Sequence, residues 1–408
     1  MKLLYVVQRY GEEVLGGSET ACRMFAEHLV SRGHEVDVLT SCALSYVDWA
    51  NEFPPGVQSI NGVRVVRLPV IEPRIEKQFA LAHGMMLKHP RSSPLFDQQR
   101  WARVMGPNLE GITEWLLDHG HEYDVVIFMT YLYATATVGL PAVSGRVPTI
   151  LQPTAHDEPM AYFGLFHSLF RMPDAFIFFT PEEKETVSEI YQLDPVGPIA
   201  GIGIDLPDGS AVPEDFRRAF PGVSANYLIY VGRLDVNKGV DELISFFVEY
   251  RRKTDQQVDL VLAGAGPLAV ADHPFIHTTG FLSETMKSSA IAGARALIQP
   301  SYYESFSIVL CEAWAQARPA MVQEGCEVLR GQALRSGGAI PYGSFAEFKA
   351  GVELLLAKPD VSDLLGRNGR RYVESQYDWE QVVDKVEEAA EIAIRRFEER
   401  RLRTTPLR

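Results

Sequence analysis

Residues 296–313, ALIQPSYYESFSIVLCEA, join a short apolar run to a polar loop and a second apolar segment of a different period. The run 296–301 begins with three consecutive apolar residues, which is typical of a strand in a parallel sheet covered by helices. After the loop, apolar residues such as Phe306 and Leu310 recur at helical spacing, with Ser305 in a position to cap the helix. This stretch predicts a strand, loop and helix of an α/β fold.

Similar apolar runs occur along the whole chain and are separated mostly by segments of helical length. They cover residues 3–7, 35–40, 63–68, 124–129, 147–152 and 174–179 in the first half, and 226–234, 259–264, 275–280, 296–301, 319–323 and 337–342 in the second. Strands that alternate with helices predict doubly wound, Rossmann-like domains, which bind ligands at the carboxyl ends of their strands. We therefore expect two such domains facing each other across a cleft.

The alternation of strand and helix patterns is interrupted between residues 201 and 222, where glycine and proline are frequent. We predict an N-terminal domain over 1–205, a hinge over 206–222 and a C-terminal domain over 223–378. A C-terminal helix with a basic tail covers 379–408. This last helix either closes the second domain or returns to the first.

Composition and charge exclude several classes of protein. The chain has 408 residues, 46% of them hydrophobic and 23% charged, which is ordinary for folded domains. A net charge of −14 argues against nucleic acid as a partner, because phosphate backbones are held by clustered lysine and arginine. The longest internal apolar stretch, 125–133, is about half the ~20 residues that a membrane span needs. The N-terminal apolar run is also too short for a signal peptide.

The four cysteines, Cys22, Cys42, Cys311 and Cys326, are far apart and form no C-x-x-C pair. They predict reduced thiols in a cytoplasmic protein. The acidity of the chain is uneven, since residues 64–103 hold eight lysines and arginines against three acidic residues. This basic stretch is interpreted either as a solvated face or as a site for an anionic acceptor or a lipid headgroup, which leaves peripheral membrane contact open.

Two cations follow a strand of the second half. Arg233 and Lys238 stand in VGRLDVNKG, residues 231–239, which ends a strand and leads into a helix that begins near Gly239. Cations at a strand end beside a helix N-terminus are a plausible clamp for a diphosphate. The alternative is a pair of surface cations near Asp235 and Asp241.

A glycine-containing loop follows the first strand. Gly16 and Gly17 precede Ser18 and Glu19, at a point where glycines let a ligand approach the backbone and free amides attract anions. The alternative is a simple cap, in which Ser18 satisfies one amide of the helix and Glu19 complements its dipole. The loop lacks the G-x-G-x-x-G spacing of a dinucleotide fold, which argues against a dehydrogenase.

Two carboxylates flank the start of the helix that follows residues 296–301. Glu304 precedes it and Glu312 lies within it, at most ~12 Å apart along a helix axis. That span suits a ligand extended from a sugar to a ribose. The alternative is that Glu304 is an exposed residue at a helix entrance and Glu312 a solvated helix position.

The chain resembles the retaining family-four glycosyltransferases of the GT-B fold over nearly its whole length. The E-x₇-E motif of that family matches ESFSIVLCE at 304–312, and its G-R-x-x-x-x-K-G phosphate element is similar to GRLDVNKG at 232–239. Gly16 and Gly17 look like its first glycine loop, and residues 154–157 resemble its H-D segment. Many members have glycine at the position of Ser307, and the stretch 325–338 is also less typical.

By this resemblance, Glu304 contacts the hydroxyl groups of the donor sugar and Glu312 contacts the ribose. Arg233 and Lys238 hold the diphosphate, and His156 lies near the donor sugar. The implied catalytic residues are Glu304, His156, Arg233 and Lys238, and the implied donor-binding residues are Gly16, Gly17, Arg233, Lys238, Glu304, Ser305, Phe306, Ser307, Ile308 and Glu312.

The resemblance implies an enzyme that moves a hexose-type sugar from a UDP- or GDP-sugar to a carbohydrate, lipid-linked or small hydroxyl acceptor, with retention of configuration. The donor would lie mainly on the second domain and the acceptor mainly on the first. The leaving diphosphate would take the acceptor proton, so no side-chain nucleophile is needed. We expect no cofactor besides this co-substrate and no obligatory metal, because the sequence has no convincing D-x-D pair. A sugar-nucleotide epimerase and a nucleotide-sugar-binding protein are the alternatives.

Overall fold

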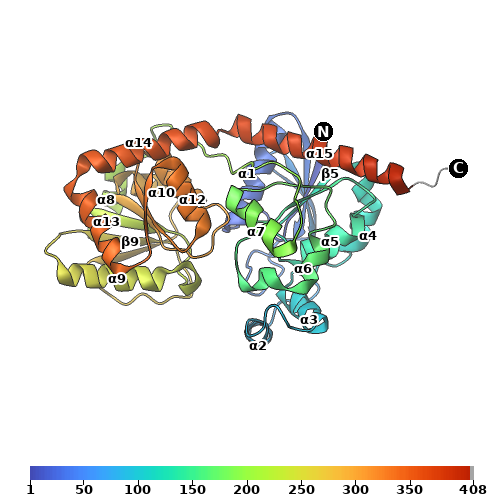
Figure 1. The fold of residues 1–408 in the computed structure, drawn as a ribbon, viewed down its shortest axis with the longest axis horizontal. Helices are drawn as coiled ribbons and strands as arrows, with labels where there is room; N and C mark the ends of the chain where they lie inside the picture. The colour runs from blue at the N-terminus through green and yellow to red at the C-terminus, as the bar shows by residue number, and fades with distance from the viewer. Residues whose placement is uncertain (405–408) are drawn as a thin grey trace. The chain divides into compact units, whose positions relative to one another are not determined.

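The computed structural model describes residues 1–404, so residues 405–408 of the predicted basic tail lie outside the described residues. The chain forms two compact units (Figure 1). Unit 1 comprises Met1–Ile202 and the chain from Glu380 onward, and unit 2 comprises Gly203–Trp379. Each unit is built on one mainly or wholly parallel sheet with helices on its faces.

The sheet of unit 1 has seven strands in the order β3-β4-β2-β1-β5-β6-β7. Its strands are β1 (Lys2–Val6), β2 (Glu35–Ser41), β3 (Gly56–Ile60), β4 (Val63–Leu68), β5 (Val125–Met129), β6 (Thr149–Gln152) and β7 (Ala175–Phe176). Its helices are α1 (Gly17–Ser31), α2 (Glu76–Met86), α3 (Leu95–Met105), α4 (Ile112–His119), α5 (Ala134–Val143), α6 (Gly164–Leu169) and α7 (Pro181–Tyr191), with 3-10 turns η1 (Gly120–Glu122) and η2 (Pro159–Tyr162). All pairings are parallel except that of β3 with β4.

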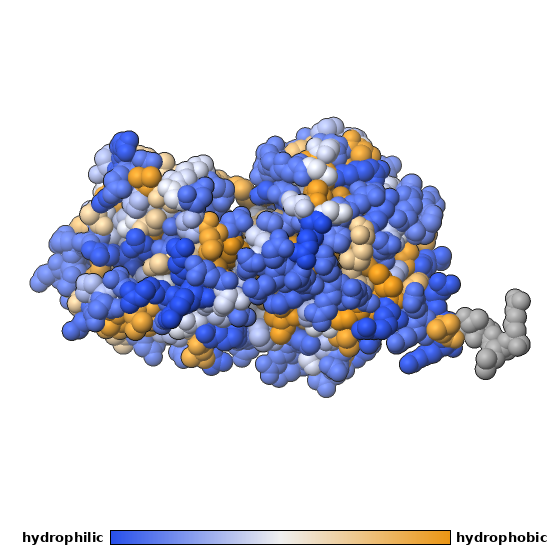
Figure 2. All heavy atoms as spheres, turned by 90° about the horizontal axis from the view of Figure 1, so that it is seen from above, coloured by the Kyte–Doolittle hydropathy of each residue, from blue (hydrophilic) through white to orange (hydrophobic). Residues whose placement is uncertain are grey.

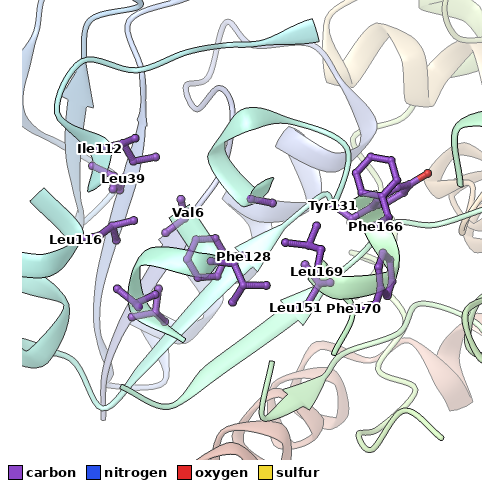
Figure 3. Packing of buried hydrophobic residues seen from close by; sticks show 14 of the residues in the cluster. Val6, Leu39, Ile112, Leu116, Phe128, Tyr131, Leu151, Phe166, Leu169 and Phe170 are labelled. Atoms are coloured by element: carbon purple, nitrogen blue, oxygen red, sulfur yellow. The ribbon is translucent and has the colours of Figure 1, made fainter. Parts of the chain in front are cut away.

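The core of unit 1 lies between this sheet and its helices. Figure 3 shows Phe128 of β5 and Leu151 of β6 among side chains of the covering helices, such as Leu116 and Phe166. All four are at most 1% exposed. The strands predicted from continuous apolar runs are therefore buried on both faces, as a parallel sheet requires.

The sheet of unit 2 has six strands in the order β10-β9-β8-β11-β12-β13, all parallel. Its strands are β8 (Tyr227–Val231), β9 (Asp259–Ala263), β10 (Ile276–Gly280), β11 (Ala296–Gln299), β12 (Ala320–Gln323) and β13 (Ala339–Tyr342). Its helices are α8 (Pro213–Ala219), α9 (Val240–Lys253), α10 (Glu284–Gly293), α11 (Ile308–Ala315), α12 (Glu327–Ser336), α13 (Phe345–Ala357) and α14 (Pro359–Gln376), with the 3-10 turn η3 (Val236–Lys238). The prediction of two Rossmann-like domains is confirmed.

The segment predicted as a hinge, residues 206–222, contains helix α8 and belongs to unit 2. At the start of this unit, the amide of Ile204 donates to the carbonyl of Tyr377 at 2.9 Å. Beside it, Gly203 lies so close to the Trp379 indole that a Cβ would come within 2.1 Å of a ring atom. The first and last segments of unit 2 are therefore packed against each other.

The last helix, α15 (Trp379–Thr404), returns to unit 1. Arg32, just after α1, forms ion pairs with Glu380 and Asp384, and His34 Nε2 lies 2.7 Å from Glu387 Oε1. Apolar residues of α15 such as Val386 are fully buried. Of the two arrangements open to this helix, the return to the first domain is the one the structure adopts.

Candidate active site

The predicted phosphate element follows β8 in unit 2. After Lys238, Gly239 adopts a left-handed φ of 69°, and a Cβ there would lie 2.3 Å from the carbonyl oxygen of Pro300. Only glycine allows this approach, because any side chain would push the two loops apart. The close contact brings the loop after β8 against the loop after β11, which carries Glu304.

Lys238 and Glu304 form the central ion pair of this site. Lys238 Nζ donates to Glu304 Oε1 at 2.7 Å and to the carbonyl of Tyr303 at 3.3 Å. The Lys238 side chain is 32% exposed and that of Glu304 is 15% exposed, so the pair is partly shielded from water. The predicted phosphate ligand and the predicted sugar ligand thus touch directly, which the sequence analysis did not anticipate.

Arg233 is held by a different carboxylate. Its Nη2 lies 2.9 Å from Asp235 Oδ2, and its backbone carbonyl accepts from the Tyr230 hydroxyl at 2.8 Å. Burial, with the nearby Glu304 carboxylate, raises the pKa of Tyr230, so this hydroxyl stays protonated and continues to donate. The surface-pair alternative correctly named Asp235 as a partner of Arg233.

Helix α11 begins at Ile308, and the expectation that Ser305 caps it is wrong. Ser307 occupies the N-cap position with φ 76° and ψ 80°, and its side chain makes no capping hydrogen bond. The three residues between Glu304 and Ile308 thus form a turn and are not part of the helix. The apolar spacing predicted the buried face correctly, but the left-handed turn shifts the helix start.

Glu312 lies on the second turn of α11 and pairs with a lysine that the sequence analysis missed. Lys287 Nζ, on α10, is 2.9 Å from Glu312 Oε1 and 2.7 Å from Glu284 Oε2. Burial lowers the pKa of Lys287, but the two carboxylates outweigh this effect and leave the pKa raised. Because Lys287 and Glu312 are 25 residues apart, no local pattern relates them.

In unit 1, the glycine loop is built on a buried ion pair. Helix α1 starts at Gly17 with Gly16 as its N-cap residue, so the alternative in which Ser18 caps the helix is wrong. The Ser18 hydroxyl instead donates to Glu19 Oε2 at 2.8 Å. Glu19 Oε1 accepts from Arg9 Nη2 at 2.6 Å and from its Nε at 2.9 Å.

This ion pair explains why residue 16 is glycine. A Cβ on Gly16 would lie 2.4 Å from Glu19 Oε2 and 3.0 Å from Arg9 Nη2. Arg9 and Glu19 are each 5% exposed, so losing either partner would leave a buried charge without compensation. The sequence analysis did not single out Arg9, because no local pattern shows that it reaches Glu19.

The loop that carries His156 follows β6 in unit 1. Thr154 has a left-handed φ of 55°, and the next amide, that of Ala155, donates to Glu183 Oε1 at 2.8 Å. Glu183 is buried, and its burial raises the pKa to about 8 even though backbone amides donate to it. His156 Nδ1 lies 3.9 Å from Glu158 Oε1. The loop is therefore anchored by a carboxylate that the sequence analysis did not single out.

Within residues 1–404, no three His, Cys, Asp or Glu side chains are grouped so that they could hold a metal ion. The expectation that activity needs no metal stays a prediction.

Across the same residues, no helix has the length and apolar character needed to span a membrane. The face drawn in Figure 2 is mainly hydrophilic, with apolar patches between.

Residues 16–196 match the family model of the glycosyl transferase 4-like domain, and residues 225–358 match that of the glycosyl transferases group 1. The chain belongs to these glycosyltransferases. The two matched segments lie in units 1 and 2, so both halves of the glycosyltransferase are accounted for. The predicted family is confirmed.

Relatives and solved structures agree with this assignment. The glycosyltransferase is 26% identical to the glycogen synthase of Mycobacterium tuberculosis, over 94% of this chain and 92% of that one. The sucrose-phosphate synthase of Thermosynechococcus elongatus superposes with a TM-score of 0.71 at 16% identity, covering 95% and 98% of the two chains. Anabaena HepE in complex with UDP and glucose gives 0.67 at 13% identity, covering 95% and 98%. The GT-B fold is thereby shown.

Proposed function

We propose that this glycosyltransferase moves a hexose-type sugar from a UDP- or GDP-sugar to a carbohydrate, lipid-linked or small hydroxyl acceptor, and that the product keeps the donor's anomeric configuration. The observation that carries the proposal is the Lys238–Glu304 pair at 2.7 Å, beside the uncapped start of helix α11. A cation and the amides at a helix N-terminus can bind the diphosphate of such a donor, and a carboxylate can accept hydrogen bonds from the hydroxyl groups of its sugar.

The chemistry follows from the charges at this site. When a diphosphate arrives, Lys238 is shared between Glu304 and the phosphate oxygens. Glu304 then turns its acceptor oxygens toward the sugar hydroxyl groups. As the bond between sugar and phosphate breaks, negative charge grows on the leaving oxygen, where Lys238, Arg233 and the α11 amides stabilise it. Glu304 acts here as an acceptor of hydrogen bonds and not as a nucleophile.

Glu312 and Lys287 fit the other end of the donor. The carboxylate of Glu312 is held by Lys287 on one oxygen, which leaves its second oxygen to accept from ribose hydroxyl groups. The fact that HepE was solved with UDP and that a glycogen synthase is among the relatives supports a nucleoside diphosphate sugar as donor. The role of His156 near the sugar remains part of the proposal.

A screen of donors tests the proposed function. Unfolding temperatures are measured with UDP-, GDP- and ADP-sugars, and a donor at 100 times its Kd stabilises the protein by ~2.7 kcal/mol. Release of nucleoside diphosphate is then followed with and without candidate acceptors. Donor turnover without acceptor would indicate an epimerase, and binding without diphosphate release would indicate a binding protein. Proton NMR of the first-formed product gives its anomeric configuration, and an inverted product would refute retention.

The hairpin of α2 and α3 in unit 1 is the candidate surface for an anionic or lipid-linked acceptor. It exposes large apolar side chains, including Leu81, Met85 and Phe96, which are 68%, 60% and 72% exposed. Lys77 and Arg100 are exposed on the same two helices. We propose that this hairpin contacts the anionic surface of a membrane that carries the acceptor, because exposed apolar and basic side chains together favour such surfaces.

Vesicle binding tests this surface. The protein should sediment with vesicles that contain anionic lipid and not with purely neutral vesicles, and added salt should weaken the binding. Phe96→Ser and Arg100→Glu together should abolish it. Undiminished sedimentation of that double variant, or equal binding to neutral vesicles, would refute the membrane contact without affecting the proposed transfer reaction.

A further inference from the structure

The turn that leads into helix α11 has an unusual backbone. Ser307 adopts φ 76° and ψ 80°, in the left-handed region that non-glycine residues rarely occupy. This conformation disfavours any residue with a Cβ, and it persists only where the surroundings enforce it. The neighbours of Ser307 must therefore hold it in place.

Ser307 stands at the N-cap position of α11 but does not act as a cap. A capping serine normally has an extended backbone, and its hydroxyl oxygen accepts from the second or third amide of the helix. Here the Ser307 hydroxyl oxygen accepts from Gln299 Nε2 at 2.8 Å instead, and the Ser307 side chain makes no capping hydrogen bond. The Ser307 hydroxyl therefore does not occupy the first amides of α11.

Gln299 is the last residue of β11 and is only 5% exposed. Its Nε2 is engaged with Ser307, while its Oε1 is buried and meets no donor within residues 1–404. A buried amide oxygen without a partner costs stability, and an apolar side chain of the same size would avoid that cost. A glutamine that lowers stability here suggests a functional reason for its amide.

A second glutamine fixes the other side of the turn. Gln332 Nε2, from α12, donates to the carbonyl of Phe306, and Gln332 Oε1 accepts from Cys311 Sγ at 3.6 Å. The ring of Phe306 packs edge-on against Tyr377 at 4.9 Å between centroids. Two buried glutamine amides, from β11 and α12, thus form hydrogen bonds with two consecutive residues of this turn, Ser307 and Phe306.

We propose that Gln299 is a positioning residue that holds the Ser307 hydroxyl away from the start of α11, so that the first helix amides remain available to the leaving diphosphate. This inference rests on the proposed function. Without the Gln299 amide, Ser307 relaxes to an extended backbone and caps its own helix. Its hydroxyl oxygen then occupies an amide that the diphosphate would otherwise use.

The proposal predicts that Gln299 matters only when residue 307 can cap. A glycine at 307 has no hydroxyl and accepts the left-handed backbone without strain. We therefore expect Gln299→Met to weaken diphosphate binding about fivefold to tenfold in the Ser307 protein, since one N-cap contact is worth about that much. In a Ser307→Gly background the same substitution should weaken binding by less than about twofold.

The coupling between residues 299 and 307 is measured by isothermal titration of four proteins: the unmodified protein, Gln299→Met, Ser307→Gly and the double variant. The probes are inorganic pyrophosphate, UDP and GDP, which share the diphosphate and differ in the base. Equal weakening by Gln299→Met in both backgrounds overturns the proposal. In turnover assays with a donor that the enzyme accepts, Gln299→Met should mainly raise KM for that donor. This increase should be smaller when residue 307 is glycine.

Gln323→Met is the matched control. Gln323 is the last residue of the adjacent strand β12 and is 1% exposed, and its amide contacts Glu242 and the Gly325 amide rather than Ser307. Its substitution also removes a buried glutamine at a strand end. Its effect on pyrophosphate binding should be the same whether residue 307 is serine or glycine, and a coupling as large as that of Gln299 would overturn the specific role of Gln299.

Hydrogen exchange at the second and third helix residues, Val309 and Leu310, gives a readout that needs no ligand. Gln299→Met should slow exchange at one of these amides when residue 307 is serine, because a cap forms there. The change should be absent when residue 307 is glycine. Unchanged exchange in the Ser307 protein overturns the proposal, whereas failure of pyrophosphate, UDP and GDP to bind the unmodified protein would refute the proposed function instead.

Discussion

Lys238→Met removes the cation at the centre of the candidate site and keeps most of the side chain's volume. Removing one group that stabilises developing charge typically costs ~2.7–4 kcal/mol of transition-state free energy. Lys238 is 32% exposed, which places the expected loss at the lower end of that range and predicts turnover about 10²-fold slower. The substitution also leaves Glu304 without its partner at 2.7 Å.

The stability cost of the same substitution should be small. The pair is partly exposed, so after screening by solvent we expect a loss of ~1 kcal/mol, between the values for surface and buried pairs. In domains of this size such a loss lowers the unfolding temperature by ~2–4 °C. The fold should therefore survive while the rate falls.

Lys349→Met is a matched control for Lys238→Met. Lys349 pairs with Glu353 on α13 at 2.8 Å and is 34% exposed, so it resembles Lys238 in pair geometry and exposure but lies outside the candidate site. Turnover is measured by release of nucleoside diphosphate at saturating donor, and unfolding by circular dichroism. Turnover of Lys238→Met within a fewfold of the unmodified protein would remove this lysine from the mechanism.

Three further predictions address the carboxylates and the metal. Glu304→Gln should lower kcat by ~2–4 kcal/mol of transition-state free energy, whereas Glu312→Gln should mainly raise KM for the donor; a similar pattern for both would contradict their separate roles. Activity should persist in EDTA, and complete loss that Mg²⁺ or Mn²⁺ restores would contradict metal independence. The pKa of Glu183, about 8 in the fold, lies above its ordinary value of 4.5, so the unfolded chain loses this proton first. Stability should fall as pH rises from about 4.5 to about 8, and Glu183→Gln should flatten this dependence, which urea unfolding at several pH values measures.

Most strands were predictable because burial on both faces leaves a mainly apolar run in the sequence. Each of the twelve parallel strands coincides with or lies within one of the predicted runs to within a residue or two. β3 was missed because it is an antiparallel edge strand with mostly exposed residues, such as Val57 at 59% exposure. An edge strand of this kind carries no apolar signal, since its position depends on pairing with β4.

The candidate site was predictable only where its residues belong to a local motif. Glu304, Glu312 and Lys238 could be named from spacing and resemblance, but neither the direct contact of Lys238 with Glu304 nor the pairing of Glu312 with Lys287 could be foreseen. Lys287 and Arg9 meet carboxylates 25 and 10 residues away, through contacts that only the tertiary fold creates. The start of α11 was also misplaced, because a left-handed serine at 307 follows no sequence rule for helix caps.

The return of α15 to unit 1 has a consequence for the order in which the protein is made. Ribosomes add about 5–20 residues per second, so roughly 10–40 s separate the synthesis of Ile202 from that of the last helix. During that time unit 2 emerges as one continuous segment and can complete its own core. In unit 1, the surface around Arg32 and His34 stays uncovered until α15 has been synthesised and packs against it. The half of the enzyme that is translated first is therefore the half that finishes folding last.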